Sequence, residues 1–346
     1  MTQISVCGWD IGGAHLKLVS VDATGRVLNA RQIACPLWRG TEHLRRAMLD
    51  ALSTNLTPST QHVITMTGEL CDNFESRTEG VGEILAVVTQ VLDPNKTRVY
   101  AGGLGWRTIE QALTLGAEQI GSANWRATAE TVASSYENAL LIDVGSTTTD
   151  LVPILSGAPE VLGIDDASRL SNNELIYSGV VRTPVMALSQ FVPMAGVWQR
   201  VAAEHFANTA DIYRILGELR ECADLHETAD GGPKTIAASA RRLCRVLGRD
   251  LSEDANSIRS LANYFAYRQF DLLQRAVLSL QSRPGPNYET IVAAGVGAFV
   301  AHKLARFNEI SCVDYASLFD VQPKLETAVM TCAPAAALTK LWRTRG

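Results

Sequence analysis

The first 34 residues consist of three short apolar segments, ISVCGWD, HLKLVSVD and VLNARQIA, separated by the turns Gly12-Gly13 and Ala23-Thr24-Gly25. Short apolar runs punctuated by glycine are typical of strands joined by tight turns, so this region predicts a three-stranded β-meander. Helical spacing follows over 42–52, 79–92 and 123–135, with strand-like runs at 62–66 and 98–101. Such alternation predicts a layered α/β domain.

The pattern restarts at Ala139, where ALLIDVGSTTTDLVPILSGAPEVL again predicts strand, glycine turn, strand, turn and strand. With Asp10 placed on Asp143, DIGGAHLKLVSV aligns with DVGSTTTDLVPI at an offset of 133 residues. Both copies follow an apolar strand and open a glycine turn, so the structural context repeats with the residues. We therefore predict two related lobes, 1–137 and 138–346, with the chain crossing back at its C-terminal end.

The segment 197–282 has apolar spacing that predicts helices nearly throughout, interrupted by the polar loop 227–233. It predicts a helical subdomain carried by the second lobe. A strand is then expected over 290–294, followed by Gly295-Val-Gly297 and a helix. A last helix is expected over 324–342.

Composition narrows the class of protein. Hydrophobic residues make up 47% and charged residues 19% of 346, as in an ordinary globular protein, and the formal charge of −5 argues against a general nucleic-acid partner. The seven scattered cysteines form no zinc-spaced motif. The longest apolar run, 291–301, has 11 residues, whereas a membrane span needs about 20. Since no signal peptide pattern opens the chain, we expect a cytoplasmic protein without a membrane partner.

The first motif that could carry chemistry is Asp10-Ile-Gly12-Gly13-Ala-His-Leu-Lys17. A carboxylate at a strand end can hold Mg²⁺, and a glycine turn can point backbone N–H groups at phosphate oxygens. Lys17, on the next strand, could reach a phosphate. The alternative is a plain β-turn beside a surface lysine.

The second motif, Asp143-Val-Gly145-Ser146-Thr147-Thr148-Thr-Asp150, adds hydroxyl groups that can donate to phosphate oxygens. A run of threonine is also ordinary strand material. Because two such turns recur at equivalent places, we predict that they face each other and bind a polyphosphate, with Asp10, Asp143 and Asp150 as ligands of Mg²⁺.

Three further residues are candidates for the site, and the two glycines among them also have a purely structural interpretation. Gly295 and Gly297 could contact a nucleotide or diphosphate, or could serve close strand-to-helix packing. Glu69, after the strand at 62–66, is a candidate acid/base residue.

Three residues are candidates for substrate binding. Asn124 could contact substrate or cap a helix, and Trp125 could stack on an aromatic substrate or anchor the core. Arg182 could bind a carboxylate or phosphate, or could be a surface arginine before Pro184.

These motifs resemble a known family over essentially the whole chain. DIGG-x-x-x-K, DVGSTTTD and the late strand–GxG–helix resemble the superfamily of acetate and sugar kinases, actin and the heat-shock cognate chaperones, in its hydantoinase/oxoprolinase-like branch. WDIGGAHLK, TMTGELCD, SANWRATA, SGVVRTPV, TADIYRILG, RRLCRVLGRD and ETAVMTCAPA are more closely similar to the family found with tetrahydromethanopterin-linked one-carbon transfer genes.

The resemblance implies an α/β fold of two duplicated actin-like (ribonuclease H-like) lobes. It also implies a transferase of methanofuran-type cofactor biosynthesis, which joins an aminomethylfuran-methyl diphosphate to the phenol oxygen of a γ-glutamyltyramine-type acceptor and releases diphosphate. Mg²⁺ and the catalytic residues Asp10, Lys17, Asp143 and Glu69 would suit that chemistry. Three rivals stay open: an ATP-dependent small-molecule kinase, a ring-opening hydrolase of the oxoprolinase kind, and a nucleotide-sensing scaffold. The oligomeric state stays open as well.

Overall fold

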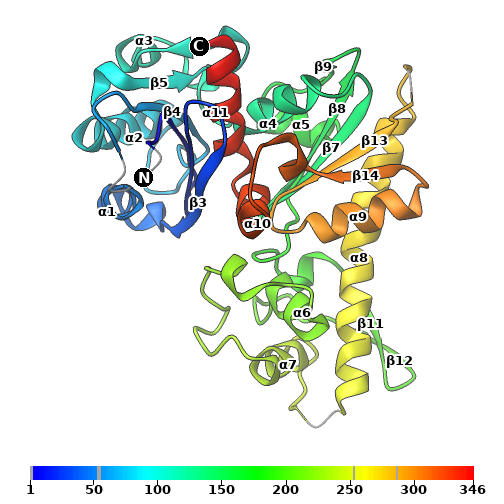
Figure 1. Cartoon of the computed structure of the whole chain (residues 1–346). Coiled ribbons are helices and arrows are strands. Elements are labelled where there is room, and N and C mark those ends of the chain that lie inside the picture. Colours follow the sequence, from blue (N-terminus) through cyan, green and yellow to red (C-terminus); the bar gives the residue numbers. More distant parts are fainter. Residues whose placement is uncertain (1–2, 53–55, 252–253, 286) are drawn as a thin grey trace.

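Two α/β lobes lie side by side, and a third, mainly helical body lies below the second lobe (Figure 1). The computed structural model describes residues 3–52, 56–251, 254–285 and 287–346. In that part of the chain, no helix is long and apolar enough to cross a membrane.

The first lobe is built on a mixed sheet whose strand order is β3-β2-β1-β4-β5-β6. Its strands are β1 (Val6–Ile11), β2 (His15–Val21), β3 (Val27–Ala34), β4 (Gln61–Met66), β5 (Thr97–Tyr100) and β6 (Trp106–Arg107). Helices α1 (Thr41–Ala51) and α2 (Arg77–Val91) cover one face, and the short α3 (Ile109–Leu113) lies near β5 and β6. Trp9 and Ile11 point from β1 into that core, because alternate residues of a strand face opposite sides.

The second lobe repeats this order with β10-β8-β7-β13-β14. Its strands are β7 (Ala139–Val144), β8 (Thr149–Leu155), β9 (Ala158–Pro159), β10 (Leu175–Ile176), β13 (Thr290–Ala294) and β14 (Ser311–Asp314). Helix α9 (Ala298–Phe307) packs on β13 and β7, and α5 (Asp166–Ser171) precedes β10. The expected third strand of the meander is reduced to β9 and β10, which pair with opposite ends of β8.

The backbone of the two glycine turns confirms the duplication. In the first lobe the N–H of Gly12 donates to the carbonyl of His15 at 3.0 Å, and in the second Gly145 donates to Thr148 at 2.8 Å. The same bond therefore closes both turns at the offset of 133 residues found in the sequence. The predicted fold class, a duplicated two-lobe actin-like α/β fold, is confirmed.

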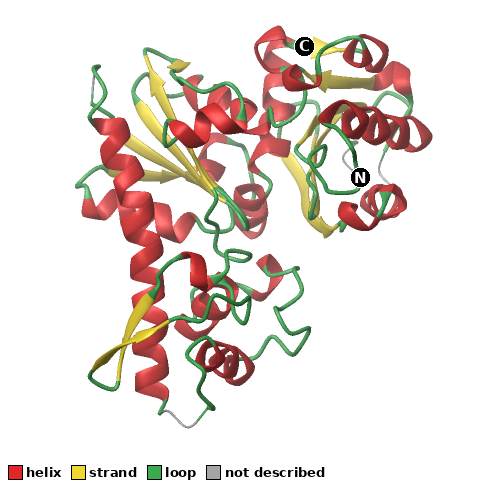
Figure 2. Cartoon of the chain, turned by 180° about the vertical axis from the view of Figure 1, so that it is seen from behind, coloured by secondary structure: helices red, strands yellow, loops and turns green. Residues whose placement is uncertain are grey.

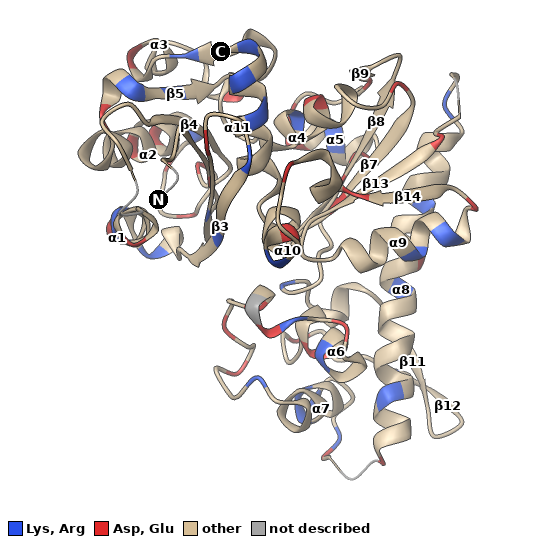
Figure 3. Cartoon of the chain, viewed as in Figure 1, with Lys and Arg blue, Asp and Glu red and all other residues tan. Residues whose placement is uncertain are grey.

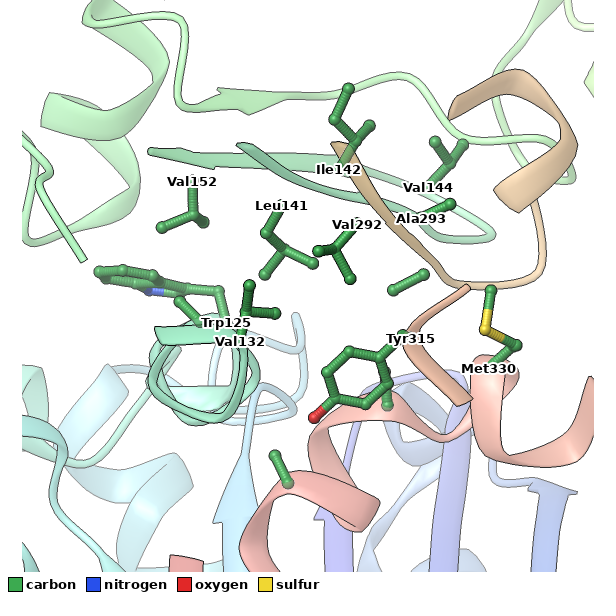
Figure 4. Close-up of a cluster of buried hydrophobic side chains, with 14 of the residues drawn as sticks. Trp125, Val132, Leu141, Ile142, Val144, Val152, Val292, Ala293, Tyr315 and Met330 are labelled. Carbon is green, nitrogen blue, oxygen red and sulfur yellow. The ribbon is translucent and has the colours of Figure 1, made fainter. Parts of the chain in front are cut away.

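The lobes exchange their last helices. Helix α4 (Asn124–Ala133) follows the first sheet but packs on β7, β8 and β9, whereas α11 (Ala333–Arg345) packs on β1, β2 and β4. Gly8 permits the second contact, because a Cβ there would lie 2.1 Å from the carbonyl oxygen of Ala335. Figure 4 shows Trp125 and Val132 of α4 in one apolar cluster with Leu141 and Val152 of the second sheet. In space, α4 thus belongs with the second sheet, and the boundary at residues 137/138 stays a prediction.

The third body has its own small core. It contains the hairpin β11 (Phe191–Met194) and β12 (Val197–Arg200), helices α6 (Thr209–Leu216) and α7 (Ile236–Arg245), and the first half of α8 (Ala255–Gln281). Helix α8 runs from this body up to the second sheet (Figure 2). Because its second half packs in the core of that sheet, one long helix ties the body to the second lobe.

Two helices predicted from the sequence are wrong. Residues 198–206 (WQRVAAEHF), expected to be helical, form most of β12 and a loop, because Ala195 (φ 51°) and Gly196 (φ 79°) make the two-residue turn of a β-hairpin. The last helix is two helices, α10 (Pro323–Thr331) and α11, which meet at Cys332. Pro334 lies in the first turn of α11, where a missing N–H does no harm.

Candidate functional site

Both glycine turns line one cavity of about 280 Å³ between the lobes. Most of the predicted site residues border it: Asp10, Gly12, Gly13, Lys17, Asn124, Trp125, Asp143, Gly145, Ser146, Thr147, Thr148, Asp150 and Arg182. Glu69, Gly295 and Gly297 do not. The structure therefore brings the two motifs together, whereas the roles of individual residues stay predictions.

In the first turn, the backbone carbonyl groups accept hydrogen bonds from a neighbouring segment of the chain. The carbonyl oxygens of Gly13 and Ala14 accept hydrogen bonds from the N–H groups of Leu37 and Cys35, each at 2.9 Å. The N–H of Gly13 has no protein acceptor in the described part of the chain.

The second turn is held in the same way. The carbonyls of Gly145 and Ser146 accept from Val180 and Arg182, at 3.0 and 2.9 Å. The N–H groups of Ser146 and Thr147 have no acceptor among the residues described. Two concave surfaces that present N–H groups and hydroxyls are suited to bind phosphate oxygens.

Asp10 and Lys17 are direct partners across β1 and β2, and Lys17 Nζ lies 3.3 Å from Asp10 Oδ2. The other oxygen, Asp10 Oδ1, is buried and has no hydrogen-bond partner among the described residues. Burial opposes the charge on Lys17, but the carboxylates of Asp10 and Asp143 outweigh it and raise the pKa of the ammonium group. Lys17 is therefore a cation held next to an incompletely satisfied carboxylate.

Asp143 and Asp150 are the equivalent partners across β7 and β8. The second lobe therefore has two carboxylates at the positions where the first lobe has a carboxylate, Asp10, and an ammonium group, Lys17. Burial, followed by the charge of Asp150, raises the pKa of Asp143 to about 7. Asp150 is paired instead with the buried Arg169, whose Nη1 lies 2.8 Å from Asp150 Oδ1.

Two helices begin at the cavity, α4 near Asn124 and α11 near Pro334. The partial positive charge at a helix N-terminus favours an anion there. Asn124 is the first residue of α4 rather than its N-cap, which is Ala123, and its Oδ1 accepts from the N–H of Trp125 at 2.8 Å.

Trp125 and Arg182 differ in how far they are free to contact a ligand. The Trp125 side chain is packed in the core, and the Arg169 guanidinium lies 4.1 Å from its ring centroid. Arg182 Nη1 donates to Thr147 Oγ1 at 3.4 Å, and its guanidinium lies 5.7 Å from the Trp38 ring. No carboxylate of the described residues lies within ion-pair distance of Arg182, so it is available to bind an anion.

Glu69 lies behind the cavity wall. Ser122, which lines the cavity, donates to Glu69 Oε1 at 3.0 Å, while Glu69 Oε2 is buried without a partner in the described chain. Burial raises the pKa of Glu69 to about 7. Arg77 Nε lies 3.9 Å from Oε1.

Gly295 and Gly297 support the second turn from behind. At Gly295 (φ 82°) a Cβ would lie 2.3 Å from the carbonyl oxygen of Val144 and 2.4 Å from Asp143 Oδ1. At Gly297 it would meet Val144 and Val180. Their positions match the close-packing alternative.

Several cavity residues were not predicted from the sequence, among them His15, Asp166, Arg169 and Tyr177. Burial, with Lys17 and other cations nearby, lowers the pKa of His15 to about 3, so it is neutral. Asp166 and Arg169 lie in α5 and Tyr177 directly follows β10, in a part of the sequence where we recognised no motif.

Neither lobe has a large region of one charge sign in the part of the chain that the structure describes, because acidic and basic positions are interspersed along both (Figure 3). No group of three or more His, Cys, Asp or Glu side chains in the described residues could by itself hold a metal ion. A divalent cation here would need oxygens from a ligand as well, and Mg²⁺ is commonly bound by one or two carboxylates together with substrate phosphates.

The fold and this cavity define a member of the two-lobe actin-like class. The family model of the hydantoinase/oxoprolinase family matches residues 61–329. The chain belongs to this family.

Two curated relatives carry the same name, (4-{4-[2-(gamma-L-glutamylamino)ethyl]phenoxymethyl}furan-2-yl)methanamine synthase. The protein of Methanocaldococcus jannaschii is 31% identical over 315 residues, which cover 89% of this chain and 91% of that one. The protein of Methanococcus vannielii is 31% identical over 205 residues, 58% of this chain and 91% of that one.

Among solved structures, nucleotide-free acetone carboxylase, from work on ATP-dependent acetone carboxylation, superposes with a TM-score of 0.57 at 11% identity. The match covers 98% of this chain and 70% of that one. At this identity the likeness concerns the fold alone.

Proposed function

We propose that this protein is a transferase of methanofuran-type cofactor biosynthesis, which joins an aminomethylfuran-methyl diphosphate to the phenol oxygen of a γ-glutamyltyramine-type acceptor. The observation that carries the proposal is the near full-length similarity to the Methanocaldococcus jannaschii synthase. That enzyme's name describes a phenoxymethyl ether between a phenol and a furan, which is the bond that this reaction forms.

The cavity has groups that suit a diphosphate. In the reaction the bond between the furan-methyl carbon and diphosphate breaks and the electron pair leaves with the diphosphate. The phenol oxygen forms the new bond to that carbon, and its proton passes to a carboxylate of the site. Lys17, Arg182 and the N–H groups and hydroxyls of the second turn lie where they could stabilise the charge that develops on the leaving oxygens.

Mg²⁺ fits the residues present. Asp10 Oδ1 is a buried, unpartnered carboxylate oxygen, and Asp143 lines the same cavity, so these two would hold the cation. When bound, Mg²⁺ would neutralise diphosphate charge. Asp150 is already bound by Arg169, which makes it a weaker candidate ligand.

The decisive experiment measures diphosphate release with purified protein, Mg²⁺, the furan-methyl diphosphate and γ-glutamyltyramine. Release that requires the acceptor and yields the ether supports the transferase. ATP turnover to ADP without any tyramine compound would instead support the kinase. ATP-dependent ring opening would support the hydrolase, and nucleotide binding without turnover the scaffold.

A further inference from the structure

One corner of the cavity differs from the phosphate-binding turns in having an uncovered apolar wall. Leu70 of the first lobe and Tyr177 of the second both line the cavity, yet their exposed fractions are 47% and 60%. Leu175 lines the same cavity. Large apolar side chains that border a cavity without covering one another leave a surface for an apolar part of a ligand.

The same corner has an excess of carboxylate groups. Arg77 Nη2 lies 3.9 Å from Asp166 Oδ2, and its Nε lies 3.9 Å from Glu69 Oε1. The Arg77 guanidinium is therefore shared by two carboxylates from different lobes, and both distances are close to the limit of about 4 Å for an ion pair. Glu69 Oε2 is in addition buried and unpartnered in the described chain. Asp166 lines the cavity and is only partly satisfied by Arg77.

At the turns, cations accompany the carboxylates. Lys17 pairs with Asp10 and Arg169 with Asp150. Arg182 faces the cavity beside Thr147 without a carboxylate partner in the part of the chain described. Among the described residues, Asp166 has only the distant Arg77 as its ion-pair partner, at 3.9 Å, and Tyr177 is within electrostatic range of both Asp166 and Arg182. A ligand with an anionic and a cationic end would be oriented in one direction.

We propose that Asp166 binds the primary ammonium group of the aryl-methyl diphosphate donor, with the furan ring against Leu70 and Tyr177, and so selects the amine-bearing donor. This inference rests on the proposed function. The relatives' name ends in methanamine, so their product carries a primary amine on the furan side. An alkyl amine is protonated at neutral pH and offers three N–H donors, which a carboxylate can accept.

The acceptor is a second source of the same chemistry, because its γ-glutamyl group carries an α-ammonium. We assign the corner to the donor. Asp166 shares the cavity with the turns that would hold the diphosphate, and the amine and diphosphate of the donor lie only one furan ring apart. The α-ammonium of the acceptor is much farther from its phenol oxygen.

The test compares wild type with Asp166→Asn, using the aminomethylfuran-methyl diphosphate and its analogue without the aminomethyl group. Loss of a charge-assisted hydrogen bond corresponds to roughly 10- to 100-fold in affinity. We expect the KM for the amine-bearing donor to rise by that factor and the KM for the analogue to change less than about threefold. Asp72→Asn, an exposed acid outside the cavity, should leave both values unchanged.

Calorimetry of both donors without acceptor keeps the inference separate from the proposed function. If wild type prefers the amine-bearing donor and Asp166→Asn does not, the subsite is supported even where no diphosphate is released, a result that would count against the transferase alone. Equal effects of Asp166→Asn on both donors would overturn the subsite. It would also be overturned if the variant raised the KM for γ-glutamyltyramine but not for N-glutaryltyramine, which lacks the α-amino group.

Discussion

The two glycine turns share a backbone and differ in chemistry. Each follows a buried strand, is closed by the same hydrogen bond and starts from an aspartate, Asp10 or Asp143. Seven residues later the first lobe has Lys17 and the second has Asp150. The duplication thus keeps the geometry of the turn, while the different residues on the neighbouring strand make the two halves of the cavity electrically unlike.

This asymmetry has a physical consequence for each aspartate. Asp10 faces a cation at 3.3 Å, although burial raises the pKa of this carboxyl. For Asp143, burial, followed by the charge of the facing Asp150, raises the pKa to about 7. The first turn therefore already contains a counter-charge. In the second turn Arg169 is the counter-charge of Asp150, whereas Asp143 has no ion-pair partner among the described residues, so a bound cation or a proton would stabilise it.

The largest effect is expected from removing either aspartate charge. Asp10→Asn and Asp143→Asn should each lower kcat by about 100-fold or more, the scale seen when a group that stabilises developing charge is lost. Side-chain volume is nearly kept, so both variants should remain folded, which a melting curve checks. Diphosphate release at saturating substrate is the measurement, and wild-type turnover in both variants would contradict the phosphate-binding role of the turns.

Lys17 and Asp150 test the difference between the turns directly. Lys17→Ala should lower turnover by roughly 10- to 100-fold, with partial recovery at higher Mg²⁺, because another cation can screen the same phosphate charge. Asp150→Asn disrupts the pair with Arg169 and should lower turnover less, without recovery. Turnover titrated against Mg²⁺ distinguishes them; identical Mg²⁺ responses would mean that the charge difference has no function.

Two glycines behind the turns test how rigidly each is supported. Gly295→Ala should cost about 1–3 kcal/mol of unfolding free energy, because its Cβ would meet backbone at 2.3 Å and its φ is 82°. Gly68→Ala, behind the first turn, should cost less, since its nearest obstacle is the movable Leu37 side chain at 2.7 Å. Chemical denaturation measures both, and a larger cost at Gly68 would contradict this ranking.

The smallest effect is a pH dependence of stability. A carboxylate whose pKa is raised on folding binds more protons in the native state, so its contribution to stability falls as pH rises from about 4 to about 7. Asp143→Asn should remove the part of this decline that Asp143 causes. We expect that part to correspond to a few degrees in melting temperature. Glu69, whose pKa burial also raises to about 7, is the second carboxyl group that should contribute to this pH dependence.

Melting curves from pH 5 to 8 for wild type, Asp143→Asn and Glu69→Gln would separate the two contributions. Mg²⁺-diphosphate should restore the stability of wild type at pH 8 but not that of Asp143→Asn. An Asp143→Asn curve that keeps the full pH dependence would show that Asp143 is ionised throughout.

Patterns of apolar and polar residues were sufficient to predict those strands and helices whose structure depends on residues close in the sequence. The strands at 62–66 and 290–294 and the helices at 42–52 and 79–92 were predicted within two residues of their observed bounds, because alternation and glycine punctuation act over a few positions. The helix expected over 198–206 was wrong, since the apolar spacing of this segment fits a helix as well as a strand. The positive φ angles of Ala195 and Gly196 decided between them.

The sequence by itself determined that the fold is duplicated and that two aspartate–glycine turns carry the candidate chemistry, because both depend on short motifs recurring in the same context. Only the tertiary structure decided how those motifs combine. The exchange of α4 and α11 between lobes, the pairing of Arg169 with Asp150, and the sharing of Arg77 by Glu69 and Asp166 all join residues that do not belong to one helix or strand. Such contacts follow from packing of apolar faces across the whole molecule, and no periodicity within one segment encodes them.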